Sequence, residues 1–274
     1  MDRERTPNKP RRITPAVLLD TGKYLLVMAG IIWLLAAGST RLGYNWQWYR
    51  IPAFILKPSA TGYTTGPLLQ GLGITLEITA ISMVLMLVLG LGTALMRMSR
   101  SIVAIGVARV YMELIRNTPL LIQLFFLYFV AGPILGLSGF WAAVIALSMF
   151  EGAYASEIFR AGITSIDRGQ WEAARSLGMP PSVMYRKIIL PQAIRRVLPP
   201  ITSQAVSLVK DSALVSTVAI LDLTQRGRMI DAETFLTFEI WFTVAAIYLV
   251  VTLSLSSVAR ILEKRLGGIS SPTA

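Results

Sequence analysis

Long apolar segments alternate with short polar ones along most of this chain of 274 residues. An α-helix needs about twenty mostly apolar residues to cross a membrane. The pattern predicts six spans, of which the first is short: 24–38, 75–96, 102–130, 140–160, 197–214 and 238–262. We therefore predict an all-α, polytopic helical membrane protein.

The third predicted span is interrupted near its middle by Asn117, Thr118 and Pro119. Proline has no backbone N–H and clashes with the carbonyl one turn earlier, so the helix should kink there and leave carbonyl groups free. Asn117, Thr118 and, about one turn further on, Gln123 offer side-chain donors and acceptors to a polar substrate. The alternative, that these residues only cap and kink the helix, stays open.

A polar segment from Glu172 to Pro191 separates the fourth and fifth predicted spans. Asp167 is a candidate N-cap for a first short helix, and Gly178 supplies the left-handed residue that closes a helix C-terminus. Pro180 and Pro181 can begin a second helix, which Pro191 should end or kink. Trp171, Ala174 and Leu177 share one face of the first helix. The small alanine side chain on that face predicts a surface on which another protein can pack closely. An interfacial helix below the membrane is the alternative.

The basic residues indicate the orientation of the spans. Lys and Arg total 26 against 15 Asp and Glu. With a cytoplasmic N-terminus, eighteen of the basic residues fall in inside segments and five in outside segments. This bias follows the positive-inside rule, so we predict that both termini and the polar segment are cytoplasmic. Lipid orientation also explains the net charge of +11 without nucleic acid binding.

Composition excludes several kinds of chemistry. The chain has no Cys and no His, so it can form no disulfide framework, no thiolate nucleophile and no metal site built on those ligands. We predict no catalytic residue and no metal site.

Ionisable residues inside spans are costly in lipid and mark function by default. Glu157 and Arg160 lie three apart on one helix, so they can form an ion pair; contact of Glu157 with a substrate is the alternative. Lys210 and Asp211 are adjacent and point to different helix faces, which favours a structural or gating role with partners elsewhere. Glu77 and Glu151 have no partner visible in the sequence.

The polar segment resembles the EAA loop of the membrane permease subunits of binding-protein-dependent ABC importers. The residues that carry the resemblance are Glu172, Ala173, Ala174, Gly178, Ile188, Leu190 and Pro191. The stretches RNTPLLIQLFFLYF, EIFRAGI and LVKDSALVS are similar to the polar amino-acid subfamily (the His/Gln/Glu/Arg type). The resemblance covers roughly residues 68 to 266 and implies a type I ABC importer permease fold of about five core spans, with one span added before them.

The resemblance also implies partners. In that family the loop is a coupling helix that docks on a separate ABC ATPase subunit. Gly22-Lys23 is followed by Tyr24 and lacks the upstream glycine of a phosphate loop, so we expect this chain to bind no cofactor and ATP-Mg to sit on the ATPase. The other expected partners are a second permease subunit of the same or a similar chain, a periplasmic substrate-binding protein and membrane lipid.

The expected organisation has four parts: a basic cytoplasmic tail (1–22), the added span with a periplasmic loop (23–66), the transporter domain (67–266) with its EAA loop at about 164–196, and a C-terminal tail (267–274). The leading hypothesis is a non-enzymatic permease in a bacterial inner membrane that imports polar amino acids by alternating access. An ion-gradient-driven secondary transporter using Glu77, Glu151 or Glu157 as proton carrier is the alternative, and a membrane scaffold that transports nothing is a third.

Overall fold

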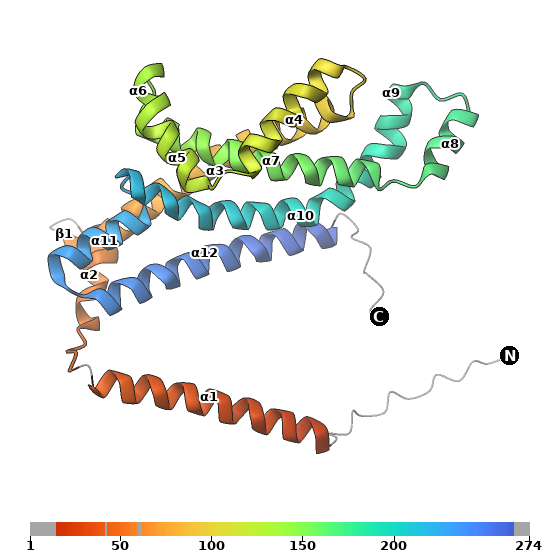
Figure 1. The fold of residues 1–274 in the computed structure, drawn as a ribbon. Coiled ribbons are helices and arrows are strands. Elements are labelled where there is room, and N and C mark those ends of the chain that lie inside the picture. The colour runs from red at the N-terminus through yellow and green to blue at the C-terminus, as the bar shows by residue number, and fades with distance from the viewer. Residues whose placement is uncertain (1–14, 42, 60–61, 266–274) are drawn as a thin grey trace. The chain divides into compact units, whose positions relative to one another are not determined.

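A computed structural model of the chain describes residues 15–41, 43–59 and 62–265. It is almost entirely helical, with one small antiparallel hairpin, which confirms the predicted all-α class (Figure 1). The chain divides into two compact units, Met1–Gln47 and Trp48–Ala274. The two units are described separately below.

The first unit contains one long helix, α1 (Pro15–Arg41). The sequence predicted a shorter apolar helix from residue 24 and an irregular tail before it. The helix instead begins at Pro15, because the first turn of a helix tolerates a residue without an N–H and proline is pre-set for helical φ. Residues 1–14 of the predicted tail lie outside the described residues.

The second unit opens with short elements where the sequence predicted only a loop. A 3-10 turn, η1 (Trp48–Arg50), leads into α2 (Ile51–Ile55) and a hairpin of β1 (Leu56–Ser59) and β2 (Gly62–Thr65). The hairpin register pairs Leu56 with Thr65 and Ser59 with Gly62. Ile51 is buried in a core with residues of later helices, and this packing orders the segment. The other residues of that core include Leu68, Leu223, Leu236, Ile240 and Val244.

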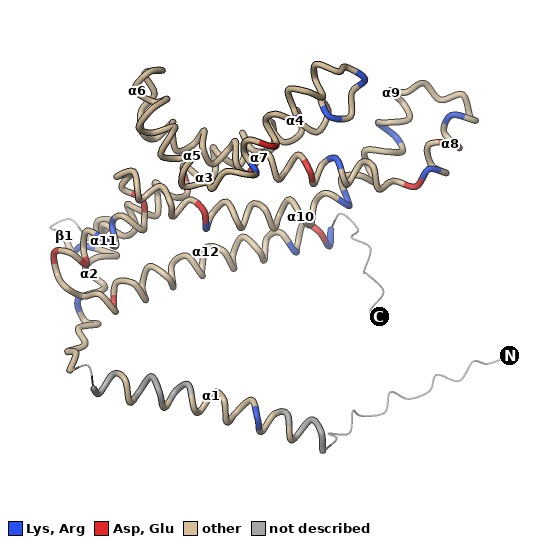
Figure 2. Tube along the Cα trace, viewed as in Figure 1, with Lys and Arg blue, Asp and Glu red and all other residues tan. Residues whose placement is uncertain are grey.

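Three helices are each long and apolar enough to cross a membrane: α3 (Pro67–Met98), α7 (Gly139–Thr164) and α12 (Thr237–Arg265). In α12 the charged residues lie only near the two ends, as the tube drawing shows (Figure 2). These helices match three of the predicted spans.

The closest packing in the unit is between α3 and α7. A Cβ on Gly90 would lie 2.7 Å from the Cβ of Ala155, so the glycine lets the two backbones approach. Ser82 donates a hydrogen bond to the Val144 carbonyl at 3.3 Å. Small residues and hydroxyl hydrogen bonds are the usual means of joining helices in lipid.

The third predicted span is broken where the sequence places Pro119. Helix α4 (Ile102–Arg116) ends there, and α5 (Leu120–Phe125), a π-helical turn (Phe126–Ala131) and α6 (Gly132–Leu135) follow. The two halves meet at 105°. The predicted kink is thus in the right place, but the chain turns through more than a right angle. If the bent pair counts as one span, four segments pass the length and apolarity test.

The fifth predicted span differs more. Helix α10 (Leu190–Asp211) contains Pro199 and Pro200 and is too polar to count as a span by composition alone. It is nevertheless held by the rest of the unit, because Leu208 is fully buried in a core with Ile78 of α3 and Leu147 of α7. The 3-10 segment η4 (Ser212–Val218) and the amphipathic α11 (Leu223–Thr234) follow; the sequence predicted that the region of α11 does not span.

Candidate functional site

The first helix of the polar loop after α7 is folded as the sequence predicted. Helix α8 (Arg168–Ser176) begins at Asp167, whose carboxylate accepts a hydrogen bond from the Gly169 N–H at 2.6 Å. It ends at Gly178, which has φ of +67°. The Met179 N–H donates to the Ala174 carbonyl at 3.1 Å, which satisfies a carbonyl that the helix end would otherwise leave free. Both the N-cap and the glycine stop are confirmed.

The second arm of the loop is continuous with a long helix. Helix α9 (Pro181–Met184) passes through a π turn (Tyr185–Ile189) directly into α10. Of the two outcomes predicted for Pro191, the end of the helix is not observed, but the helix changes direction between α9 and α10, as Figure 1 shows. Proline clashes with the carbonyl four residues earlier, that of Lys187, and the π turn widens the helix at that residue. The second arm of the loop is therefore joined to α10 by continuous but bent helix.

The face of α8 that was predicted to receive another protein lies mostly inside the loop. Ala174 is fully buried in a small core with Ile163, Met184 and Ile189. The Trp171 ring meets the Tyr185 ring edge to face, with centroids 5.4 Å apart. The turn at Gly178 folds α8 back onto the second arm, so this face packs against the chain itself. Only Leu177, with 77% of its surface exposed, remains outward.

The other residues of the EAA pattern divide between two surfaces. Glu172, Ala173 and Gly178 are exposed on the outer side of the loop, and Ile188 is partly buried beneath it. Leu190 and Pro191 are exposed at the start of α10. A protein that docks on this loop would therefore meet the Glu172–Ala173 edge and the Gly178 turn rather than the Ala174 face.

Glu157 is held from two sides. Arg160 Nη2 binds Glu157 Oε1 at 2.6 Å, which confirms the ion pair predicted from their spacing on α7. Arg97, at the end of α3, binds the other carboxylate oxygen. Arg97 was not predicted in this role, since it lies sixty residues from Glu157 in the chain. With both oxygens occupied, the Glu157 carboxylate joins α3 to the part of α7 that enters the loop.

The polar side chains at the break of the third predicted span bind the backbone of α4. Asn117 Nδ2 donates to the Glu113 carbonyl at 2.9 Å, and Thr118 Oγ1 donates to the Leu114 carbonyl at 2.7 Å. Gln123 Nε2 donates to two more carbonyls, those of Ile115 and Thr118, at 2.7 and 2.9 Å. The geometry thus matches the capping interpretation, although Gln123 Oε1 is buried without a partner among the described residues.

A polar cluster between α7 and α10 brings together residues that were not predicted to be in contact. Glu151 of α7 is almost fully buried, and Gln204 of α10 donates a hydrogen bond to its Oε2. The other oxygen, Oε1, has no partner in the described part of the chain. The Asp211 carboxyl group and the Lys210 ammonium group are close enough to interact with it. Gln204 and Asp211 are seven residues apart, two turns along one face of α10, and that spacing was the available signal.

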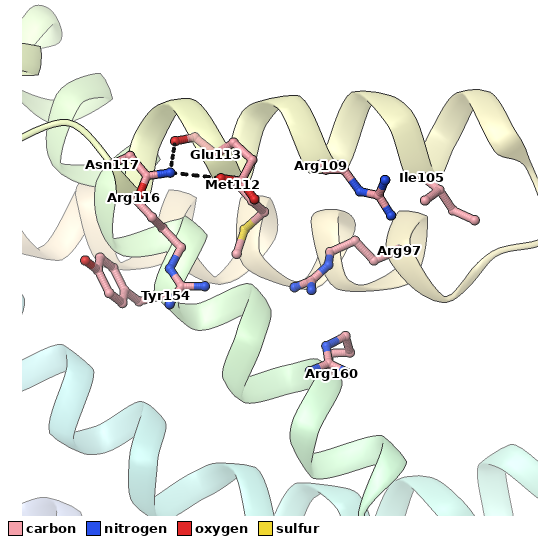
Figure 3. A pocket seen from close by; sticks show the side chains of 9 residues that line it. All are labelled: Arg97, Ile105, Arg109, Met112, Glu113, Arg116, Asn117, Tyr154 and Arg160. Atoms are coloured by element: carbon pink, nitrogen blue, oxygen red, sulfur yellow. Dashed lines mark hydrogen bonds between the residues drawn. The ribbon is translucent and has the colours of Figure 1, made fainter.

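A cavity lined by several arginines lies between α3, α4 and α7 and has a volume of about 590 Å³ (Figure 3). Four arginines line it: Arg97, Arg109, Arg116 and Arg160. Figure 3 shows Arg97, Arg109 and Arg160 directed into one space, while Arg116 reaches toward Tyr154. The Arg116 guanidinium carbon is 5.4 Å from the centre of that ring.

Comparison with known proteins identifies relatives of this chain. Residues 86–268 match the model of the family described as "Binding-protein-dependent transport system inner membrane component". The arginine transport system permease protein ArtQ of Bacillus subtilis is 38% identical over 201 residues, which are 73% of this chain and 92% of that one. A probable glutamine ABC transporter permease protein, GlnM of the same organism, is 41% identical over 195 residues, 70% of this chain and 89% of that one.

A solved structure also shares the fold. The crystal structure of an amino acid ABC transporter with histidines contains a chain that is 40% identical and superposes with a TM-score of 0.68. The match covers 73% of this chain and 94% of that chain. The predicted permease fold is therefore confirmed.

Proposed function

This chain belongs to the family of inner membrane components of binding-protein-dependent transport systems, and from that premise we propose that it imports polar amino acids as the permease subunit of an ATP-driven transporter. It is a transport subunit rather than an enzyme. The arginine and glutamine permeases among its relatives support an amino acid as substrate. Family membership does not favour the alternative of an ion-gradient-driven secondary transporter.

The observation that carries the proposal is the mechanical continuity of the loop. Its outer edge, at Glu172 and Gly178, is exposed, its inner face is buried on Ile163 and Ile189, and its second arm runs without interruption into α10. An ATPase that presses on the exposed edge would move α10 together with α7, because both share the buried core. Such coupled movement is what alternating access requires.

The partners follow from the same reasoning. ATP-Mg binds on separate ATPase subunits, which dock at the EAA loop. A second permease subunit completes the pathway, and a periplasmic binding protein delivers the amino acid from the other side. The bias of basic residues supports a cytoplasmic position for the loop and for both termini, with the chain in the inner membrane of a bacterium.

The Glu151 cluster is the better candidate for substrate contact than the break at Pro119. Asn117, Thr118 and Gln123 donate their hydrogen bonds to backbone carbonyls at the end of α4, whereas Oε1 of Glu151 makes no hydrogen bond in the described part of the chain and has the Asp211 carboxyl group near it. Two neighbouring acidic groups, Glu151 and Asp211, suit the ammonium group that every amino acid carries. Glu157 and Arg160 then hold the entry to the loop, and Lys210 and Asp211 border the substrate site.

Reversal of charge at the loop tests the coupling. We expect Glu172→Lys to leave the complex assembled in the membrane but to lower ATP-driven uptake at least tenfold in vesicles, with ATP hydrolysis no longer stimulated by substrate. The matched control is Glu233→Lys, the same change on an exposed residue of α11. Normal uptake by the Glu172 variant would refute the coupling role. Uptake that persists without ATP and collapses with the proton gradient would refute the proposed function.

A further inference from the structure

The arginine-lined cavity between α3, α4 and α7 has more positive charge than its surroundings neutralise. Glu157 binds both Arg97 and Arg160, and Glu113 is occupied by a hydrogen bond from Asn117 at 2.9 Å. Among the described residues, no ion pair neutralises Arg109. Counting Glu113 and Glu157 against four arginines leaves an excess of two positive charges.

Donor groups in the cavity are also incompletely used. The Nε of Arg160 is buried and has no partner among the described residues. Arg109 is exposed, and Figure 3 shows its side chain reaching from α4 toward the space that Arg97 and Arg160 also border. Several guanidinium groups around one cavity favour an anion with several oxygens, since each can donate two parallel hydrogen bonds.

The position of the cavity indicates which anion is within reach. Arg97 is in the last turn of α3, Arg160 is one turn from the end of α7, and Arg109 is two turns from the start of α4. With a rise of about 1.5 Å per residue, Arg109 lies roughly 10 Å from the start of its helix. These three ends are on the side of the membrane that carries the EAA loop. The arginines therefore lie at the depth of the inner-leaflet headgroups in the proposed topology.

We propose that this cavity binds the phosphate headgroup of an acidic phospholipid from the inner leaflet. Basic pockets between membrane helices on the cytoplasmic side are a recurring way of holding such headgroups. The shared chemistry is a phosphate anion, which free phosphate also offers. The proposal rests on the proposed topology, but it concerns a site separate from Glu151 and from the loop.

The test measures lipid retention by the full chain, purified in detergent with its ATPase and observed by native mass spectrometry. Phosphatidylglycerol and phosphatidylcholine are added separately at equal concentrations. We expect retention of phosphatidylglycerol only, and Arg109→Gln should weaken its apparent affinity about fivefold, the effect of one basic side chain near a membrane surface. Arg109→Glu should weaken it further. Arg100→Gln is the matched control, because Arg100 is exposed beside α4 but does not line the cavity.

Three results would overturn the proposal. The first is equal retention of the two lipids by the unmodified chain. The second is an Arg109→Gln variant that binds phosphatidylglycerol as the unmodified chain does, or an Arg100→Gln variant that loses it to the same extent. The third is displacement of the lipid by millimolar inorganic phosphate that is itself retained, which would assign the cavity to a free anion. ATP-driven uptake measured on the same preparations keeps a failure of this proposal distinct from a failure of the transport function.

Discussion

At the scale of single residues, Asp222 is a buried acid that lies outside the three long apolar helices. Its carboxylate caps α11 by accepting a hydrogen bond from the Gln225 N–H at 2.8 Å. Burial raises the pKa of Asp222 from 3.8 to about 6, although the hydrogen bonds of Gln225, Thr224 and Tyr248 oppose that shift. The folded chain therefore holds this proton more tightly than the unfolded chain does.

The raised pKa predicts how stability depends on pH. Below about pH 4 the group is protonated in both states and its favourable contribution is complete; this contribution is lost as the pH rises through 6. We expect a loss of up to about 3 kcal/mol over that window, since one pKa unit corresponds to about 1.4 kcal/mol. Asp222→Asn keeps the cap and removes the titration, so its thermal midpoint in detergent should fall less between pH 4 and 6.5. Identical pH profiles for the two chains would contradict the assignment.

Contacts between nearby residues could be predicted from the sequence, whereas contacts between distant residues could not. The Asp167 cap and the Gly178 turn depend on neighbours within a few positions, so the sequence predicted both. The Arg97–Glu157 and Glu151–Gln204 contacts join helices more than fifty residues apart. Nothing in the local pattern specifies which helices pack together, and for that reason these partners were not predicted.

At the scale of elements, the crossing of α3 and α7 depends on which glycine faces the partner helix. A Cβ at Gly90 would meet the Cβ of Ala155 at 2.7 Å, whereas a Cβ at Gly92 would meet nothing within 4 Å. We expect Gly90→Ala to destabilise the chain by about 1 to 3 kcal/mol through overpacking. Gly92→Ala is the matched control and should be neutral or slightly stabilising, because alanine is the better helix former.

Thermal unfolding of the two glycine variants in the same detergent measures the difference. A midpoint for the Gly90 variant equal to or above that of the Gly92 variant would show that the two helices can separate without cost. Low yield of the Gly90 variant alone, with normal yield of the Gly92 variant, would agree with the packing argument.

Element boundaries differ from the predicted spans for two physical reasons. Helix α10 is held by packing on α7 and not by its own apolarity, so hydropathy identified it only from residue 197 onward. The turn of 105° after α4 arises because Asn117 and Thr118 cap the helix end and Pro119 cannot continue it. The sequence located the break, but the size of the turn depends on what α5 packs against.

At the scale of the whole molecule, the relatives delimit a transporter core. The matched relatives are covered over 89–94% of their own length but match only 70–73% of this chain. The family model matches residues 86–268. The unit Met1–Gln47 is compact by itself, and the core of the second unit is built from residues after Gln47. The packing of the transporter core therefore does not depend on the first unit.

Two truncations separate helix α1 from the elements that follow it. A chain that starts at Trp48 keeps α2, whose Ile51 and Phe54 pack on Leu68 and Leu236, and should retain ATP-driven uptake within about twofold. A chain that starts at Gly66 loses these contacts; burial of two large apolar side chains is worth about 3 to 6 kcal/mol, so it should unfold at a lower temperature and accumulate poorly. Uptake in vesicles, normalised to the amount of folded subunit, compares the two. Loss of uptake by a stable chain that starts at Trp48 would instead make the first helix part of the transport machinery, because its removal leaves the second unit's packing intact.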